Sequence, residues 1–202
     1  MTYFWRYLVA AAVTIMVLAF GYWGIALPLR RSHLYIVATR ALPQVKTVEQ
    51  LETSFRAATD FAAPFGQDET VVYYVQTIHG LVRSNNDPQV VKALTQEAED
   101  VSAQMRQRGK GFNYGALLQA LGGIYEMGYL ATADVSYYQK GIDVLEKGLQ
   151  YSPGRLQFLQ GLLDFYRITG DRERVRNMAQ RILSVWPDDA FALQALSEVG
   201  KQ

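Results

Sequence analysis

A stretch of 23 uncharged residues, Tyr7–Leu29, lies between Arg6 and Arg30 and restricts the fold more than any other feature. As a helix it is roughly 34 Å long at about 1.5 Å per residue, enough to cross the ~30 Å hydrocarbon core of a bilayer. Aromatic side chains flank the stretch, as is typical of the two membrane–water interfaces. The sequence therefore predicts a membrane anchor over residues 1–31, with its span at about 7–29. The predicted membrane-interface residues are Trp5, Arg6, Tyr22, Trp23, Arg30 and Arg31.

A cleaved secretory signal is the main alternative for this segment. Such signals have an apolar region of about 7–15 residues and end at a small-residue cleavage site. Here the apolar region is longer, and Phe20–Pro28 is bulky and lacks that site. The pattern favours a retained anchor over a signal, and the charged residues at both ends argue against a buried core helix.

The net charge of +1 conceals an asymmetry along the chain, because the first acidic residue is Glu49. Basic residues follow the span and favour placing the helical body on the cytoplasmic side of the membrane, with the opposite side as the alternative. The near balance of charges argues against a nucleic-acid partner. The absence of cysteine excludes disulfides and thiol chemistry.

The remainder of the chain has a helical pattern, with breaks at Gly, Pro and Asn clusters. Thr47-Val-Glu-Gln50 predicts a capping box, and Asp87-Pro88 predicts an N-cap followed by proline in the first turn. We expect a divergent helical region over 32–111 and a repetitive region over 112–202. The predicted helices of the first region lie at about 33–42, 47–62, 68–84 and 88–108.

A repeat emerges in the last third of the chain. Pro153 and Pro187 are 34 residues apart, as are Gly141 and Val175. Each proline follows an amphipathic helix that is preceded by another helix. This period is that of tetratricopeptide (TPR) repeats, in which stacked helix pairs share a continuous core.

The repeats resemble the TPR family in their residues as well as their period. Leu162-Leu163, Tyr166, Gly170-Asp171, Val175, Ala179, Ile182 and Pro187 match one repeat, and Leu121-Gly122, Tyr125, Gly141, Leu145, Gly148 and Pro153 match the preceding one. The earlier repeat has about seven extra residues, predicted between its helices near 129–135. The resemblance implies an all-α chain, with a TPR-like solenoid that ends in a capping helix near 190–199.

A looser resemblance connects the chain to the TPR tail of bacterial O-antigen ligase-type membrane proteins. It is carried by short sequence words: Pro28-Leu-Arg-Arg, Ala41-Leu, Phe55-Arg-Ala-Ala, Gly66-Gln-Asp-Glu69 and Ser152-Pro-Gly-Arg155. The chain has a single predicted span and lacks the polytopic part in which that family performs its glycan chemistry. The resemblance implies a bacterial envelope context rather than an activity.

The residue pattern provides no catalytic constellation. His33 and His79 are the only histidines, and neither has metal-ligand partners at a suitable spacing. Phosphate-loop and nucleophile-elbow motifs are absent from the sequence. The sequence therefore predicts a non-enzyme without catalytic residues, metal or cofactor. An unfamiliar membrane enzyme remains an alternative, and it would need a buried polar cluster around His79, Asp100 or Asp164.

What remains is a surface for a partner. In TPR proteins the first helix of each pair lines the concave face, and the resemblance assigns that face to Gln119, Gly123, Glu126, Gln157, Gln160, Asp164, Arg167, Gln194 and Glu198. We expect a scaffold or accessory subunit that binds another protein in a membrane complex. One alternative is an accessory role in envelope glycan polymerisation or ligation. The other is that these residues only face solvent or a neighbouring subunit.

Overall fold

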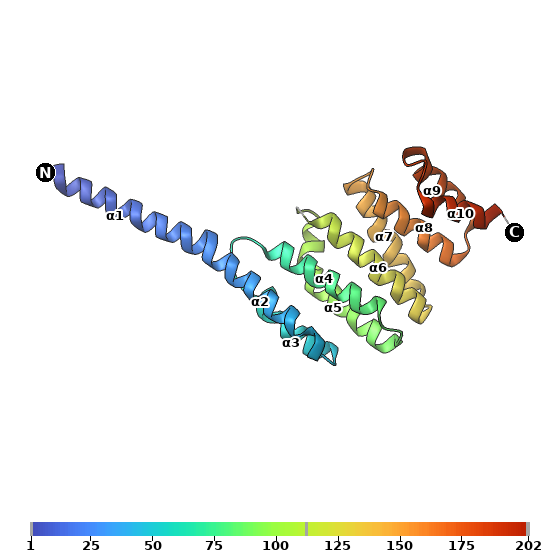
Figure 1. Cartoon of the computed structure of the whole chain (residues 1–202), viewed down its shortest axis with the longest axis horizontal. Coiled ribbons are helices and arrows are strands. Elements are labelled where there is room, and N and C mark those ends of the chain that lie inside the picture. The colour runs from blue at the N-terminus through green and yellow to red at the C-terminus, as the bar shows by residue number, and fades with distance from the viewer. Residues whose placement is uncertain (1, 112, 201–202) are drawn as a thin grey trace. The chain divides into compact units, whose positions relative to one another are not determined.

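The computed structural model describes residues 2–111 and 113–200, which form helices joined by turns and contain no strand (Figure 1). The predicted all-α class is therefore confirmed for the described residues. Residue 112, at which the third predicted segment begins, lies outside them.

One helical stretch in the described part of the chain, Phe4–Gln44, is long and apolar enough to cross a membrane. A signal sequence near the N-terminus satisfies the same criteria of length and composition, so the structure identifies a candidate span. The stretch comprises α1 (Thr2–Gly21), the π-helical η1 (Tyr22–Ala26), α2 (Leu27–Ala41) and the 3-10 turn η2 (Leu42–Gln44).

The helix continues without a break from the span into the polar sequence. The Leu27 N–H donates to the Tyr22 carbonyl five residues back, immediately before Pro28, which has no N–H to donate. The π-helical turn thus accommodates the proline inside the helix. The prediction of a separate helix over 33–42 is wrong, because residues 29–41 contain no Gly, Pro or Asn that would interrupt α2.

The chain divides into two compact units, residues 1–71 and 72–202, and the boundary lies inside α4 (Gln67–Arg83). The predicted segments 1–31, 32–111 and 112–202 divide the sequence differently. They remain a prediction.

In the first unit, α3 (Val48–Thr59) packs against α2. The first bond of the predicted capping box is confirmed, since the Gln50 N–H donates to Thr47 Oγ1 (3.2 Å). The second is shifted by one residue: Gln50 Oε1 accepts from the Lys46 N–H (2.9 Å) rather than from that of Thr47. The apolar residues of α3 that recur at helical spacing, Leu51, Phe55 and Ala58, are buried.

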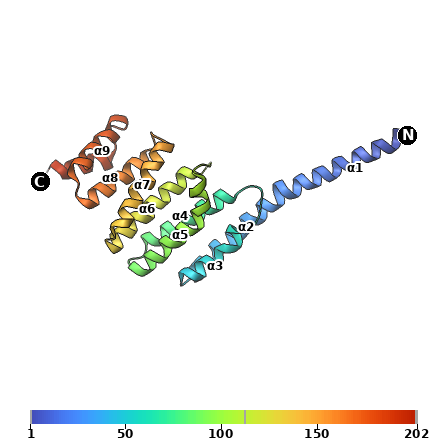
Figure 2. The same ribbon diagram turned by 180° about the vertical axis from the view of Figure 1, so that it is seen from behind.

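The second unit is a succession of helices in which each packs against the next from α5 to α10, as Figures 1 and 2 show from opposite sides. In addition, α8 contacts both α6 and α10, so these three alternate helices lie side by side. The bounds are α5 (Pro88–Arg108), α6 (Tyr114–Thr132), α7 (Val135–Tyr151), α8 (Leu156–Thr169), α9 (Arg172–Val185) and α10 (Ala190–Gly200).

Local sequence sets most of these helix ends. The Asp87 carboxylate accepts from the Gln89 N–H (2.8 Å), as predicted, and Gly109 ends α5 in the left-handed region with φ 65°. The last helix is capped in a similar way, since Asp189 Oδ1 accepts from the Ala192 N–H (2.8 Å).

Glycines allow the closest helix contacts of this unit. A Cβ at Gly122 would lie 2.7 Å from Leu145 Cδ2, and one at Gly148 would lie 2.5 Å from Phe158 Cε1. A Cβ at Gly141 would overlap the ring of Phe165. The small residues of the predicted repeat therefore mark helix-packing contacts.

The extra residues of the first predicted repeat do not form a loop between its helices, as was expected near 129–135. They lengthen the helices instead: α6 has 19 residues and α7 has 17, whereas α8 and α9 have 14 each. No Gly or Pro occurs between Tyr129 and Val135, so α6 continues to Thr132 before a tight turn.

Candidate partner-binding face

A row of polar side chains crosses the three adjacent helices α6, α8 and α10. Each of these helices buries its apolar stripe and exposes or half-buries polar residues at intervals of three or four along another side. We call this row the polar face, and its members are Gln119, Glu126, Gln157, Gln160, Asp164, Arg167, Gln194 and Glu198.

Arg167 connects the helices of the polar face. Its Nη2 lies 2.9 Å from Glu198 Oε2 on α10, and its Nη1 lies 3.4 Å from Asp164 Oδ1 on α8. Its guanidinium also lies 5.0 Å from the centroid of the Phe191 ring, a cation–π contact. Gln194 Nε2 donates to the same Glu198 (2.9 Å). Four of the eight polar-face residues thus form one network across α8 and α10.

The glutamines differ in their surroundings. Gln119 Oε1 accepts from Arg155 Nη2 (3.3 Å), and Gln160 Nε2 donates to Asp189 Oδ2 (2.9 Å). Gln157, by contrast, is exposed. Arg155 and Asp189 belong to this face, but sequence reasoning did not assign them to it. Arg155 is 36 residues from Gln119 in the sequence, and Asp189 is 29 residues from Gln160. Contacts between residues so far apart in the chain cannot be recognised from a local sequence motif.

Glu126 is the residue of the face with the most altered electrostatics. Burial and the nearby Asp164 carboxylate raise the pKa of Glu126 to about 7, and Arg83 opposes this effect. Burial also raises the pKa of Asp164, and the positive charge of Arg167 opposes this rise. The middle of the polar face therefore holds a carboxyl group that changes its charge near neutral pH.

His79 of α4 lies beside this centre. A Cβ at Gly123 would overlap the His79 imidazole, so the histidine packs over the glycine of α6. Burial and the charge of Arg83 lower the pKa of His79. Gly123, which the resemblance assigned to the concave face, is thus covered by the His79 imidazole.

The residues of the predicted alternative enzyme cluster are not all in one environment. Asp100 is exposed and accepts from Gln96 of its own helix (3.0 Å), whereas His79 and Asp164 are half-buried. Among residues 2–111 and 113–200, no group of three or more His, Cys, Asp or Glu could hold a metal ion.

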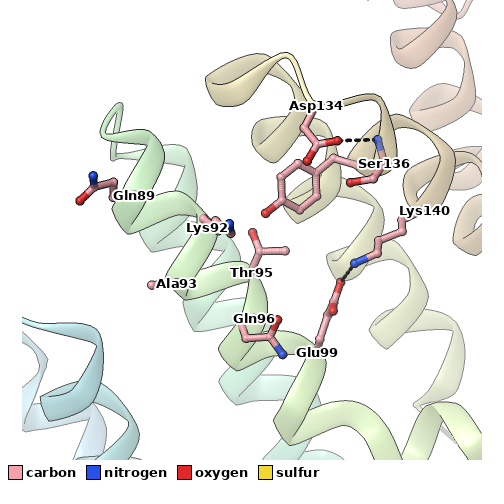
Figure 3. A pocket seen from close by; sticks show the side chains of 10 residues that line it. Gln89, Lys92, Ala93, Thr95, Gln96, Glu99, Asp134, Ser136 and Lys140 are labelled. Carbon is pink, nitrogen blue, oxygen red and sulfur yellow. Dashed lines mark hydrogen bonds and ion pairs between the residues drawn. The ribbon is translucent and has the colours of Figure 1, made fainter.

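A hollow of about 490 Å³ lies between α5 and α7, away from the polar-face residues (Figure 3). Lys140 Nζ lies 2.7 Å from Glu99 Oε1 across it, and Asp134 accepts from the Ser136 N–H (2.8 Å) to cap α7. Lys140 and Glu99, two of its four charged side chains, thus neutralise each other. These contacts account for helix capping and helix packing, and they do not form an arrangement of base and nucleophile.

The predicted membrane-interface residues fall into two groups. Five of them are exposed along the N-terminal helix: Trp5, Arg6, Tyr22, Trp23 and Arg30. Arg31 differs, because it is only 2% exposed and donates hydrogen bonds to backbone carbonyls of the loop that follows α3. The sequence alone did not indicate this burial.

Comparison of the chain with protein-family models, curated proteins and solved structures finds no match. The likeness to TPR repeats and to ligase tails therefore rests on the sequence patterns described above.

Proposed function

We propose that this protein is a membrane-anchored, TPR-like scaffold or accessory subunit whose polar face binds another protein in a bacterial membrane complex. The observation that carries the proposal is the polar network on α8 and α10, where Arg167 connects Asp164 with Glu198. Three adjacent helices present amide and carboxylate groups there, which suits recognition of a polar protein segment.

The 34-residue spacing supports the solenoid part of the proposal. Alternate helices α6, α8 and α10 lie side by side, and glycines at the repeat positions allow close packing of neighbouring helices. Stacked helix pairs of this kind expose one face formed by every second helix. The polar face lies on these helices.

The exposed apolar surface of the N-terminal helix supports anchoring. Large side chains such as Ile15, Leu18 and Phe20 are 67%, 67% and 74% exposed, and water is an unfavourable environment for such a continuous surface. A retained anchor in the bacterial inner membrane, with the body on the cytoplasmic side, is the arrangement we propose. The periplasmic side is the alternative.

Co-purification from membranes in a mild detergent tests the proposal. We expect a stoichiometric protein partner with the wild-type chain and its loss when the exposed polar-face residues Gln157 and Gln194 are both changed to Arg. The matched control is Gln180→Arg, which changes an exposed glutamine of α9. A chain that purifies alone, or a partner that the control removes equally well, would refute the proposal.

The accessory role in envelope glycan polymerisation or ligation rests on the short sequence words alone and is a second proposal. A deletion strain with an altered surface polysaccharide would favour it. An unchanged polysaccharide would count against it.

A further inference from the structure

The loop between α3 and α4 begins with the exposed Asp60, and an uncharged apolar segment follows. It reads Phe61-Ala-Ala-Pro-Phe65-Gly66, and the Phe65 side chain is 66% exposed. Phe65 and the exposed Pro64 next to it therefore form a small apolar surface on the connection between the two helices.

Arg31 holds this loop against the N-terminal helix. Its guanidinium donates to the Phe65 carbonyl (2.9 Å) and to the Phe61 carbonyl, and the side chain is buried. Gly66 takes φ +86°, a conformation that favours glycine, as the backbone turns past the Arg31 side chain. In Figure 1 the loop is the coil beside the N-terminal helix that leads into α4. The position of the loop along the helix is therefore fixed by residue 31.

That position coincides with the end of the candidate span. Arg31 follows Leu29, the last residue of the uncharged stretch, by two residues, or about 3 Å of helix rise. Arg30 lies between them, and its guanidinium is 5.4 Å from the Phe61 ring centroid. The loop thus lies at the level where a bilayer changes from acyl chains to headgroups, the level at which aromatic side chains gather.

The other end of the α2–α3 pair lies away from this level. Tyr35 contacts Phe55 and Arg31 contacts the Phe61 backbone, so the two helices run antiparallel. Because α2 continues ten residues past Arg31, to Ala41, the turn that contains Gln44 lies about 15 Å further along the helix axis. The two ends of the α2–α3 pair therefore lie at different depths relative to the span. The α3–α4 loop can be tested for membrane contact, with the turn at Gln44 as the control.

We propose that the α3–α4 loop, residues 61–66, is a second membrane-contacting element, which places Phe65 in the headgroup layer beside the span. The proposal rests on the proposed anchoring of the chain by residues 7–29. A lipid surface fits the loop because Phe65 offers apolar area while Arg30, whose guanidinium lies over the Phe61 ring of the same loop, offers a cation to headgroup phosphates. The loop would then fix the orientation of the first unit on the membrane.

Site-specific fluorescence of the full chain in lipid nanodiscs tests the proposal, and the absence of native cysteine makes the labelling specific. An NBD fluorophore is attached to Ala62→Cys in the loop, which leaves Phe65 intact, to Gln44→Cys at the far turn and to Val13→Cys in the span. The nanodiscs contain phosphatidylcholine and phosphatidylglycerol, with or without lipids that bear a nitroxide near the headgroup or in the acyl chain.

We expect blue-shifted emission at Ala62 and at Val13 but not at Gln44. The headgroup nitroxide should quench the Ala62 label, and the acyl-chain nitroxide should quench the Val13 label. Adding Phe65→Ser should remove most of the shift and quenching at Ala62. Helix content measured by circular dichroism verifies that each variant is folded.

The outcomes separate failure of the loop proposal from failure of the anchor. If Val13 is quenched while Ala62 behaves like Gln44, the loop proposal is overturned and the anchor stands. If the Ala62 emission is blue-shifted but insensitive to nitroxide lipids, the loop contacts protein, and the proposal is again overturned. If Val13 itself is not quenched, the anchor fails, and both proposals fall with it.

Discussion

Replacement of Glu126 by glutamine should stabilise the folded chain above neutral pH and have little effect in acid. Glu126 lies half-buried on α6, where burial and the Asp164 carboxylate raise its pKa from 4.5 to about 7, against the opposing charge of Arg83. His79 packs against the same helix at Gly123, and Arg167 partly neutralises Asp164. Glutamine has nearly the same shape but never acquires the unfavourable charge.

The sign of the effect follows from proton binding. Between pH 4.5 and 7 the folded chain binds a proton at Glu126 that the unfolded chain has lost, so stability falls as the pH rises. The pKa difference corresponds to about 3 kcal/mol at about 1.36 kcal/mol per unit. Solvent around the half-buried carboxyl reduces this to about 2 kcal/mol. Glu126→Gln should therefore raise the melting temperature by about 4–8 °C at pH 8.

Thermal unfolding of the full chain in detergent, followed by circular dichroism at pH 5 and pH 8, measures the effect. Glu146→Gln, at an exposed position of α7, is the control and should change neither value appreciably. An equal effect of Glu126→Gln at both pH values would refute the electrostatic argument. So would a destabilisation at pH 8, which would indicate that the charged carboxylate makes a favourable contact.

Two further predictions concern packing and the first unit. Gly141→Ala should destabilise the fold by about 1–3 kcal/mol because the methyl group meets the Phe165 ring, whereas Gly80→Ala, in open space on α4, should stabilise it by about 0.5–1 kcal/mol. Equal effects of the two substitutions in chemical denaturation would contradict this. Arg31→Gln should free the Phe61 and Phe65 carbonyls, at a cost of about 1–3 kcal/mol. Chymotrypsin should then cleave the loop faster, and an unchanged cleavage rate would show that Arg31 does not hold it.

Local features of the sequence predicted local features of the structure. The capping residues Thr47, Asp87 and Asp189 were predictable because a cap depends on residues three or fewer positions away. The buried face of α3 was predictable from helical spacing, and so was the apolar N-terminal helix. The insertion near 129–135 was placed wrongly, because a difference in length between repeats does not indicate whether the additional residues join a helix or a loop.

Contacts between distant residues could not be predicted in this way. The burial of Arg31 depends on carbonyls 30 and 34 residues away, and in the sequence the residue is indistinguishable from a charge at a membrane border. The contribution of Arg155 and Asp189 to the polar face depends on how the helices pack. Assigning the face to alternate helices located its members, but the network between them required the structure.

In-cell photo-crosslinking tests the central claim, that the polar face binds a protein partner at the membrane. A photoreactive amino acid is incorporated at Gln157 or Gln194 on the polar face, or at Gln180 on α9 as the matched exposed position. The account predicts one and the same protein adduct in the membrane fraction from Gln157 and Gln194, and none from Gln180. Adducts of equal yield from all three positions, or from none, would contradict it.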